Sequence, residues 1–326
     1  MDKFSLIKAP IKHELDEQVV LLKDSLKSQI PLIDSVVRYF LEQKGKMIRP
    51  VLVLLSAKMA GDGHVNQITK NAAVALELLH NASLIHDDVV DESDERRGRA
   101  SVNHTWDNKV AVLMGDFFLA RCLIQSTLTR TLAIQEVLSN LAASLSEGEI
   151  QQLSNARGKV LSEEAYYTVI KNKTASLFAA CMRLGAISVN ATPDKIDALT
   201  SFGEKLGIIF QIRDDIFDYF TDPVIGKPTG NDIQEGKITL PLLYALLHCS
   251  GKMHDEMLAL IEKEELSKEE ICSLVDYARI NGGIEYAQAT MRRLAFETKS
   301  LLNIFPDNEI RQSLYALVDY VIERNK

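Results

Sequence analysis

Apolar residues recur with the period of an α-helix over long stretches of this 326-residue chain. In "NAAVALELLHNASLIHDDVV", residues 71–90, the positions of Leu79, Ser83 and Asp87 are four residues apart and fall near one face of a helix. A second stretch, "LTSFGEKLGIIFQIRDDIFDYF" at residues 199–220, has the same period. The chain holds only eight prolines, and no segment shows the sustained alternation between turn signals that is typical of strands. We therefore predict an all-α protein.

Capping signals predict where several helices begin and end. Ser162 and Ser267 are each followed by a pair of acidic residues, and Thr192 precedes a proline, which are patterns typical of a helix N-terminus. The strings "GDG" at residues 61–63 and "NGG" at residues 281–283 predict breaks between helices.

The longest irregular stretch is "TDPVIGKPTGNDIQEGK", residues 221–237. Its glycines and prolines make a helix improbable there, and its length is typical of a functional loop. Since no linker composition divides the chain, we expect one helical domain over residues 1–326, with ten or more helices and no short-period repeat.

Composition excludes several classes of protein. Hydrophobic residues make up 46% of the chain, which is enough for an extensive core, and the net charge of −8 argues against a nucleic-acid-binding protein. No signal peptide is evident and no segment approaches the roughly 18 apolar residues of a membrane span, so we expect a soluble, cytoplasmic protein. The four cysteines show no CxxC spacing and are predicted to be reduced packing residues. They are Cys122, Cys181, Cys249 and Cys272.

Two clusters of aspartates share the spacing DDxxD and lie among apolar residues. Read as helix, the first and third aspartate of each cluster are i and i+4 on one face, where like charges oppose each other by roughly 0.2–0.5 kcal/mol. Such clusters require cations, and two occurrences are harder to dismiss as solvated helix ends than one. The clusters are Asp87, Asp88 and Asp91, and Asp214, Asp215 and Asp218.

The residue types in these clusters indicate which metal they would bind. Oxygen-only ligands suit Mg²⁺, which keeps several waters and completes its shell with substrate phosphate oxygens. His86 is the only histidine or cysteine close to either cluster, which disfavours zinc or a redox iron site. We therefore predict Mg²⁺ with a diphosphate, held between two helices.

Several basic residues could neutralise the diphosphates. Arg96 and Arg97 follow the first cluster within one or two helical turns. Arginine offers phosphate a planar fork and lysine a mobile point charge, so a mixture of both suits two diphosphates of different geometry. Any one of these residues taken alone is more often a surface charge. The other candidates are Lys46, Arg49, Lys173, Lys227 and Lys237.

Five motifs together give the chain a recognisable resemblance. They are "GKMIRP", "LLHNASLIHDDVVDESDERRGRASVNHTW", "KTASLF", "FQIRDDIFDYF" and "GKPTGNDIQEGKITLPL". In this order and at this spacing, between about residues 45 and 242, the chain resembles the all-trans polyprenyl diphosphate synthases. Within that family it is most similar to the long-chain enzymes of the octaprenyl and solanesyl type, which make quinone side chains.

The resemblance implies an all-α bundle of the isoprenoid synthase type, usually a homodimer, with both aspartate clusters at the mouth of a central cavity. The six aspartates would bind three Mg²⁺. Isopentenyl diphosphate would be held by Lys46, Arg49, His80 and Arg97. The allylic diphosphate would contact Arg96, Lys173, Thr174, Gln211, Lys227 and Lys237. The residues implied in catalysis are Asp87, Asp88, Asp91, Arg96, Lys173, Asp214 and Lys227. Without the resemblance, His80 would be read as a core histidine.

The reaction implied is a repeated condensation. An allylic diphosphate such as farnesyl diphosphate loses its diphosphate, the double bond of isopentenyl diphosphate attacks the allylic cation, and loss of a proton restores an allylic product. The released diphosphate is the implied base, and residues 221–237 would close over the site. A peripheral membrane contact during product release is compatible with this scheme.

Residues below the first cluster would set the product length. Ala82 and Ser83 lie one turn before Asp87, with Leu79 and Leu76 deeper, and Asp87 to Leu76 spans roughly 16 Å of helix. Shorter-chain relatives carry an aromatic near the positions of Ala82 and Ser83. Because both residues are small here, we predict an open passage and a long product of the octaprenyl class.

Other functions remain open at this point. The chain could be the catalytic subunit of a heteromeric synthase, or a synthase of farnesyl or geranylgeranyl length. A class I terpene cyclase normally has a different second metal motif, and a non-catalytic partner subunit should lack some aspartates. A di-iron bundle would need a Glu-x-x-His motif on each of two helices, and the sequence has this motif once, at Glu77 and His80.

Overall fold

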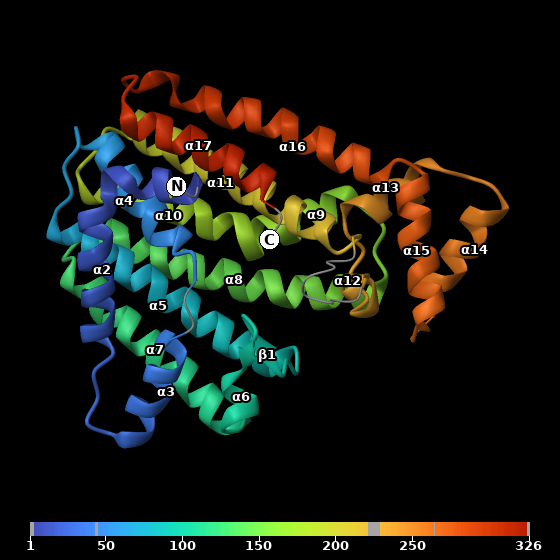
Figure 1. Cartoon of the computed structure of the whole chain (residues 1–326), viewed down its shortest axis with the longest axis horizontal. Helices are drawn as coiled ribbons and strands as arrows, with labels where there is room; N and C mark the ends of the chain where they lie inside the picture. Colours follow the sequence, from blue (N-terminus) through green and yellow to red (C-terminus); the bar gives the residue numbers. More distant parts are fainter. Residues whose placement is uncertain (1–2, 43–44, 221–228, 264, 325–326) are drawn as a thin grey trace. The chain divides into compact units, whose positions relative to one another are not determined.

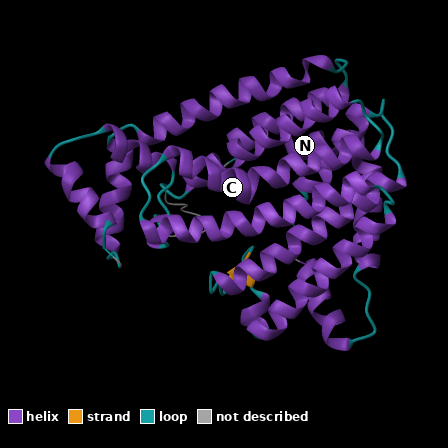
Figure 2. Ribbon diagram, turned by 180° about the vertical axis from the view of Figure 1, so that it is seen from behind, coloured by secondary structure: helices purple, strands orange, loops and turns teal. Residues whose placement is uncertain are grey.

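The computed structural model describes residues 3–42, 45–220, 229–263 and 265–324. Helices dominate these ranges, as predicted. The two strands seen there have two residues each and pair to form one hairpin (Figure 2). The backbone packs into two compact units. The first comprises residues 1–142, 178–200 and 304–314, and the second residues 143–177, 201–303 and 315–326.

The helices of the first unit surround a core built on two central helices, α4 and α5. Residues 51–55 of α4 are fully buried, and most of α5 is buried as well, so both helices are apolar on nearly all sides. The helices that lie wholly in this unit are α1 (Lys3–Lys8), η1 (Ala9–Ile11), α2 (Lys12–Ser25), α3 (Pro31–Glu42), α4 (Ile48–Ala60), α5 (Gln67–Val90), α6 (Val102–Thr105) and α7 (Asn108–Leu128).

Helices α5 and α7 lie side by side in close contact (Figures 1 and 2). A Cβ atom on Gly115 of α7 would lie 2.1 Å from Nε2 of His86 on α5, so a larger residue there would displace the His86 ring. Helix α5 begins with a capping box in which the Asn66 side chain accepts from the Thr69 amide at 2.9 Å. It ends at Val90, so the first aspartate cluster occupies its last turn.

The second unit holds the helices that follow the middle of the chain. A five-residue π-helix, η2 (Lys171–Ala175), follows α9 (Glu163–Ile170) directly. The other elements wholly in this unit are α12 (Asn231–Gln234), α13 (Leu240–His248), α14 (Lys252–Ile261), α15 (Lys268–Ile280) and α16 (Gly283–Ser300). The elements that contribute residues to both units are α8 (Leu132–Gly158), α10 (Ser176–Ser188), α11 (Pro193–Phe217), η3 (Leu301–Ile304) and α17 (Glu309–Glu323).

The predicted helix boundaries agree with the structure. Ser162 is the N-cap of α9, Ser267 forms a capping box at the start of α15, and α11 begins at the proline after Thr192. Positive φ angles at Asp62 (51°) and Gly282 (78°) mark the two predicted breaks. These local signals suffice because each depends on a few neighbouring residues.

Two local predictions were wrong. In the stretch 221–237, residues 221–228 lie outside the described residues, but Asn231–Gln234 form the short helix α12, where no helix was expected.

Arg96 and Arg97 do not continue α5 by helical turns. They belong to a hairpin of β1 (Glu95–Arg96) and β2 (Arg99–Ala100), because the helix ends and Arg97 adopts a positive φ of 55° in the turn.

Two expectations drawn from the composition of the chain do not agree with the structure. Cys122 and Cys181 are buried, but Cys272 is exposed and does not pack in the core. Helix α7 is long and apolar enough by composition to cross a membrane, contrary to the prediction that no segment approaches such a span. Its close contact with α5 at Gly115 is typical of a helix that packs within a folded unit.

Candidate active site

The first aspartate cluster lies at the C-terminal end of α5. Asp88 is buried, Asp87 is half-buried and Asp91, the C-cap residue, is exposed. A helix C-terminus carries a partial negative charge, which opposes three carboxylates in addition to their mutual repulsion. The cluster is therefore unfavourable unless cations approach it.

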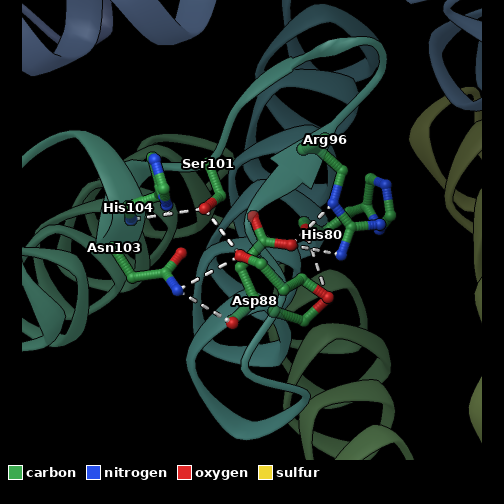
Figure 3. Close-up of polar contacts among 8 residues, drawn as sticks. His80, Asp88, Arg96, Ser101, Asn103 and His104 are labelled. Atoms are coloured by element: carbon green, nitrogen blue, oxygen red, sulfur yellow. Dashed lines mark hydrogen bonds and ion pairs between the residues drawn. The ribbon is translucent and has the colours of Figure 1, made fainter.

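Asp88 is bound by side chains that follow it in the sequence, including one from the β1–β2 hairpin. Its Oδ1 atom accepts from Nε of Arg96 at 2.8 Å and from an Nη of Arg96 at 2.5 Å (Figure 3). Burial raises the pKa of Asp88, and the Arg96 guanidinium opposes that rise. The Asn103 side chain also donates to the Asp88 carbonyl at 3.2 Å. Asp88 thus ties the β1–β2 hairpin to the end of α5.

A basic group lies beside this cluster in the same unit. Arg49, His80 and Arg97 are close enough to influence one another electrostatically, and all three were predicted to bind isopentenyl diphosphate. Burial, reinforced by the Arg49 charge, holds the pKa of His80 well below its usual range, so this histidine is neutral near pH 7. The Arg97 guanidinium lies against Gly45, where a Cβ atom would be 2.9 Å from Nη1. Lys46, the next residue, is exposed.

The sequence prediction missed a buried glutamate in this group. Glu77 is 9% exposed, and its pKa is raised by burial while Arg49 and Arg97 oppose the rise. Buried atoms without a hydrogen-bond partner occur here on Glu77 (Oε2), Arg49 (Nε) and His80 (Nε2). Buried polar atoms without a partner are uncommon in folded proteins, so three on neighbouring residues are compatible with a site that binds a polar ligand or water. A charged residue within the apolar run "AVALELLH" was the available signal.

The second aspartate cluster lies at the C-terminal end of α11, where the helix charge is again negative. Asp214 is half-buried and pairs with the Arg324 guanidinium, N to O 2.5 Å, near the end of the described chain. The Arg324 guanidinium also stacks 3.8 Å from the centre of the Phe210 ring. Arg324 was not predicted, because it is separated from Asp214 by 110 residues.

The other two aspartates of this cluster are bound by the protein. Asp215 is 3% exposed, and its two carboxylate oxygens accept from the Tyr166 hydroxyl at 2.5 Å and the Gln211 side chain at 2.8 Å. Asp218 accepts from the backbone amides of Asn231 and Asp232, both at 3.0 Å, and so caps the start of α12. Each aspartate of the DDxxD motif therefore has a different environment.

Burial changes the proton affinity of this region. It raises the pKa of Asp215 to about 8, with Asp232 and Asp214 adding to the rise, while the Tyr166 and Gln211 hydrogen bonds oppose it. It also raises the pKa of Asp232 to about 6, with Asp218 adding to the effect. Both shifts have the direction expected for carboxylates held near one another without a cation.

A cavity of about 150 Å³ opens beside Asp215 in the second unit. Lys173 and Thr174 face it from the π-helix, whose unusual geometry is common at functional sites. Lys173 pairs with Glu149 of α8 at 2.7 Å, and Thr174 donates to the Gln211 side-chain oxygen at 2.7 Å. The polar and charged side chains of the lining include Gln152, Tyr166, Lys173, Thr174, Gln211, Asp215, Asp232 and Lys237.

The predicted residues are brought together in part. Arg49, His80 and Arg97 form one group in the first unit, and Lys173, Thr174, Gln211 and Lys237 line one cavity in the second. Arg96 binds Asp88, and Lys227 lies outside the described residues. Of the residues predicted to set product length, Ala82 and Leu79 are buried, and half-buried Ser83 donates to the His80 carbonyl at 2.9 Å.

The donor atoms fit a hard divalent cation. The clusters offer carboxylate oxygens at two helix ends, and such ligands suit Mg²⁺ or Ca²⁺. Among the residues that the structure describes, no group of three or more His, Cys, Asp or Glu side chains is arranged to hold a metal by itself. A cation bound by these carboxylates would commonly complete its coordination shell with water and substrate phosphate oxygens.

Comparison with known proteins agrees with this picture. The family model for polyprenyl synthetase matches residues 30–278. Octaprenyl diphosphate synthase of Haemophilus influenzae is 34% identical over 329 residues, covering 100% of this chain and 97% of that protein. Heptaprenyl diphosphate synthase component 2 of Bacillus subtilis is 35% identical, covering 99% and 91% respectively.

Two solved structures illustrate the range of relatives. Polyprenyl synthase from Caulobacter crescentus, complexed with calcium and isoprenyl diphosphate, has a TM-score of 0.91 and 30% identity, covering 99% of this chain and 98% of that one. Geranylgeranyl pyrophosphate synthase from Bacteroides thetaiotaomicron has a TM-score of 0.86 and 41% identity, covering 99% and 100%. The family model spans most of the chain and the relatives match it nearly end to end. The chain therefore belongs to the polyprenyl synthetase family and is a trans-prenyltransferase.

Proposed function

We propose that this enzyme condenses isopentenyl diphosphate repeatedly with an allylic diphosphate to give an all-trans polyprenyl diphosphate of the octaprenyl class, for a quinone side chain. The observation that carries the proposal is that each aspartate cluster has its own group of polar and basic residues. Arg49, His80 and Arg97 accompany the first cluster, and the cavity with Lys173 and Gln211 accompanies the second. Two such groups suit a reaction with two diphosphate substrates.

The group in the first unit is proposed to hold isopentenyl diphosphate. Arginine and lysine provide the positive charge, while neutral His80 can donate one hydrogen bond without adding charge. The exposed side chain of Lys46 would provide a mobile cation at the edge of this group. Buried Glu77 offsets part of the positive charge when no diphosphate is bound.

The cavity of the second unit is proposed to receive the allylic diphosphate. Lys173 and Lys237 would neutralise its phosphate oxygens, and the Gln211 amide would donate a hydrogen bond. Lys173 now pairs with Glu149 and Lys237 with Glu235, so each lysine would exchange a carboxylate for phosphate. We further propose that Lys227 and the loop at 221–237 contribute to this site, although Lys227 lies outside the described residues.

We propose that the divalent cation is Mg²⁺, with three ions per active site. The proposed ligands are the six aspartates of the two clusters, which place carboxylate oxygens at the ends of α5 and α11. The relative from Caulobacter crescentus was solved with calcium and isoprenyl diphosphate, which supports a divalent ion beside the diphosphate. When bound, the ions would stabilise the charge that develops on the leaving diphosphate.

The residues of this chain perform the remaining tasks of the reaction. Each basic group is proposed to bind and orient its own diphosphate substrate. Fixed arginine and lysine charges stabilise the leaving diphosphate without reorganisation. No carboxylate is assigned to remove the proton, which the released diphosphate is proposed to accept.

Product length is proposed to depend on Leu79, Ala82 and Ser83, which precede Asp87 on α5. None of the three is aromatic, and Ser83 is only half-buried one turn before the cluster. The octaprenyl enzyme of Haemophilus influenzae supports a long product. The relative from Bacteroides thetaiotaomicron, named as a geranylgeranyl pyrophosphate synthase, favours a shorter one as the alternative.

The chain is proposed to act as a cytoplasmic, single-domain homodimer, and α7 is the proposed interface. This helix exposes Leu113, Leu123, Ile124 and Leu128, which fall on one side of it. We expect Leu123→Glu to convert a dimer to a monomer, because a charge there would be desolvated on association. Sedimentation measures the change, with Val20→Glu on α2, which replaces another exposed apolar residue, as the matched control.

A monomer and a heteromeric enzyme are the two alternatives to a homodimer, and sedimentation together with an activity assay distinguishes them. A wild-type chain that is monomeric at micromolar concentration would contradict the homodimer. A chain that is inactive until another subunit is added would identify it as part of a heteromeric enzyme, as the name of the Bacillus subtilis relative indicates for that protein.

Metal removal tests the proposed function directly. Condensation of labelled isopentenyl diphosphate with farnesyl diphosphate should stop in excess chelator and return when Mg²⁺ is restored, because the aspartate clusters alone only repel a diphosphate. Unfolding measured in parallel should show that the chelated enzyme stays folded. Full activity in chelator would contradict a metal-dependent reaction.

A further inference from the structure

Tyr166 is a buried tyrosine of the second unit that neither the motifs nor the proposed ligand sets include. It lies on α9 and is 9% exposed, and its hydroxyl is directed at the Asp215 carboxylate. Burial and the nearby Asp215 charge raise the pKa of Tyr166 well above its usual range, so the hydroxyl remains a donor. A buried tyrosine hydroxyl normally needs such a partner, and here that partner belongs to the second aspartate cluster.

A continuous chain of hydrogen bonds runs from Tyr166 to the π-helix. The Tyr166 hydroxyl donates to Oδ2 of Asp215 at 2.5 Å, and Nε2 of Gln211 donates to Oδ1 of the same carboxylate at 2.8 Å. The Thr174 hydroxyl donates to Oε1 of Gln211 at 2.7 Å. All four residues line the cavity. These hydrogen bonds therefore connect α9, α11 and η2 around the proposed position of the allylic diphosphate.

These contacts fix how Gln211 faces the cavity. Its oxygen accepts from the Thr174 hydroxyl, and its amide nitrogen donates to Oδ1 of Asp215, so the two hydrogen bonds together hold the amide in one orientation. An amide nitrogen has two hydrogens, so the second remains available to donate to a phosphate oxygen. A reversed amide would instead present an oxygen to the diphosphate and repel it.

We propose that Tyr166 is a positioning residue for the allylic diphosphate, because through Asp215 it holds the Gln211 amide in the orientation that donates to the substrate. The inference rests on the proposed function of this cavity. Removing the hydroxyl would leave one oxygen of Asp215 buried without a donor, and the carboxylate could turn away from Gln211. The Gln211 amide would then lose its fixed orientation.

The variant Tyr166→Phe tests this role, with the neighbouring Tyr167→Phe as the matched control. Tyr167 contacts the Tyr166 ring edge-on but lines a different hollow, beside Lys171 and Glu204. Tyr166→Phe should raise KM for farnesyl diphosphate by about 10- to 100-fold, the range seen when a hydrogen-bond partner of a metal-binding residue is removed, and should leave KM for isopentenyl diphosphate unchanged. Tyr167→Phe should leave both constants unchanged.

A double-mutant cycle checks that Tyr166 acts through Gln211. In a Gln211→Ala background, adding Tyr166→Phe should change KM for farnesyl diphosphate by less than about twofold, because the group that Tyr166 orients is already absent. Additive effects of the two substitutions would overturn the proposed route. Equal increases in both Michaelis constants would also overturn it, since they would indicate a general structural role.

Binding measured without turnover separates this inference from the proposed function. Calorimetry with Mg²⁺ and farnesyl thiodiphosphate, which resists ionisation, should show weaker binding to Tyr166→Phe than to the wild type and Tyr167→Phe. If the wild type binds this analogue more tightly than Tyr166→Phe does but performs no condensation, the proposed function fails while the role of Tyr166 stands. If the wild type condenses substrates and Tyr166→Phe binds the analogue equally well, only the inference fails.

Discussion

Replacing Asp87 by alanine is expected to reduce condensation by on the order of 1,000-fold while the metal-free protein stays folded. Asp87 is half-buried in the last turn of α5, one turn before Asp91. The helix C-terminus and the neighbouring carboxylates oppose its negative charge, so we expect the substitution to change the metal-free stability little. The lost activity would reflect the missing contact with the proposed cation.

Asp88→Ala provides the contrasting variant on the same turn. Asp88 is buried and accepts two hydrogen bonds from Arg96, so its loss should lower the free energy of unfolding by about 3 kcal/mol and loosen the hairpin. Chemical denaturation without metal measures both variants, and single-turnover rates measure the chemistry. A large loss of metal-free stability in Asp87→Ala would show that this carboxylate is structural and would contradict the assignment.

Replacing Ser83 by phenylalanine is expected to shorten the product to farnesyl or geranylgeranyl length. Ser83 lies one turn before Asp87, a rise of about 6 Å along α5, on the face that carries the cluster. Leu79 and Ala82 are buried beyond it. An aromatic ring at this depth would stop a growing tail after a few isoprene units, because the side chains of a folded interior are closely packed and cannot move aside for it.

The matched control for this variant is Ser83→Ala. It removes the hydroxyl that donates to the His80 carbonyl without adding volume, so the product length should stay that of the wild type. Products are resolved by chromatography after dephosphorylation. An unchanged product length in Ser83→Phe would show that the tail does not pass Ser83.

The sequence predicted the helices better than the roles of the aspartates. Periodicity and caps located the starts of α9, α11 and α15, because these signals are local. The DDxxD spacing grouped the aspartates by helix face but could not separate them by function. Asp215 binds Tyr166, 49 residues away, and Asp214 binds Arg324, 110 residues away. Such contacts depend on how distant parts of the chain pack together, and a short sequence motif gives no information about that packing.

The sequence prediction for the basic residues was limited in the same way. The motif resemblance predicted Arg49, His80 and Arg97 as one group, and their electrostatic coupling in the structure agrees with it. It did not predict Glu77, which carries the opposing charge within that group. The hairpin that carries Arg97 was also missed, because a positive φ at an arginine has no strong sequence signal.

The most direct test of the central claim is a turnover assay of the purified chain alone. The assay contains Mg²⁺, farnesyl diphosphate and labelled isopentenyl diphosphate, and products are resolved by length. We predict a narrow distribution centred on the octaprenyl product. Folded protein that forms no elongated product, or that stops after one or two additions, would contradict the proposed long-chain synthase acting without a partner.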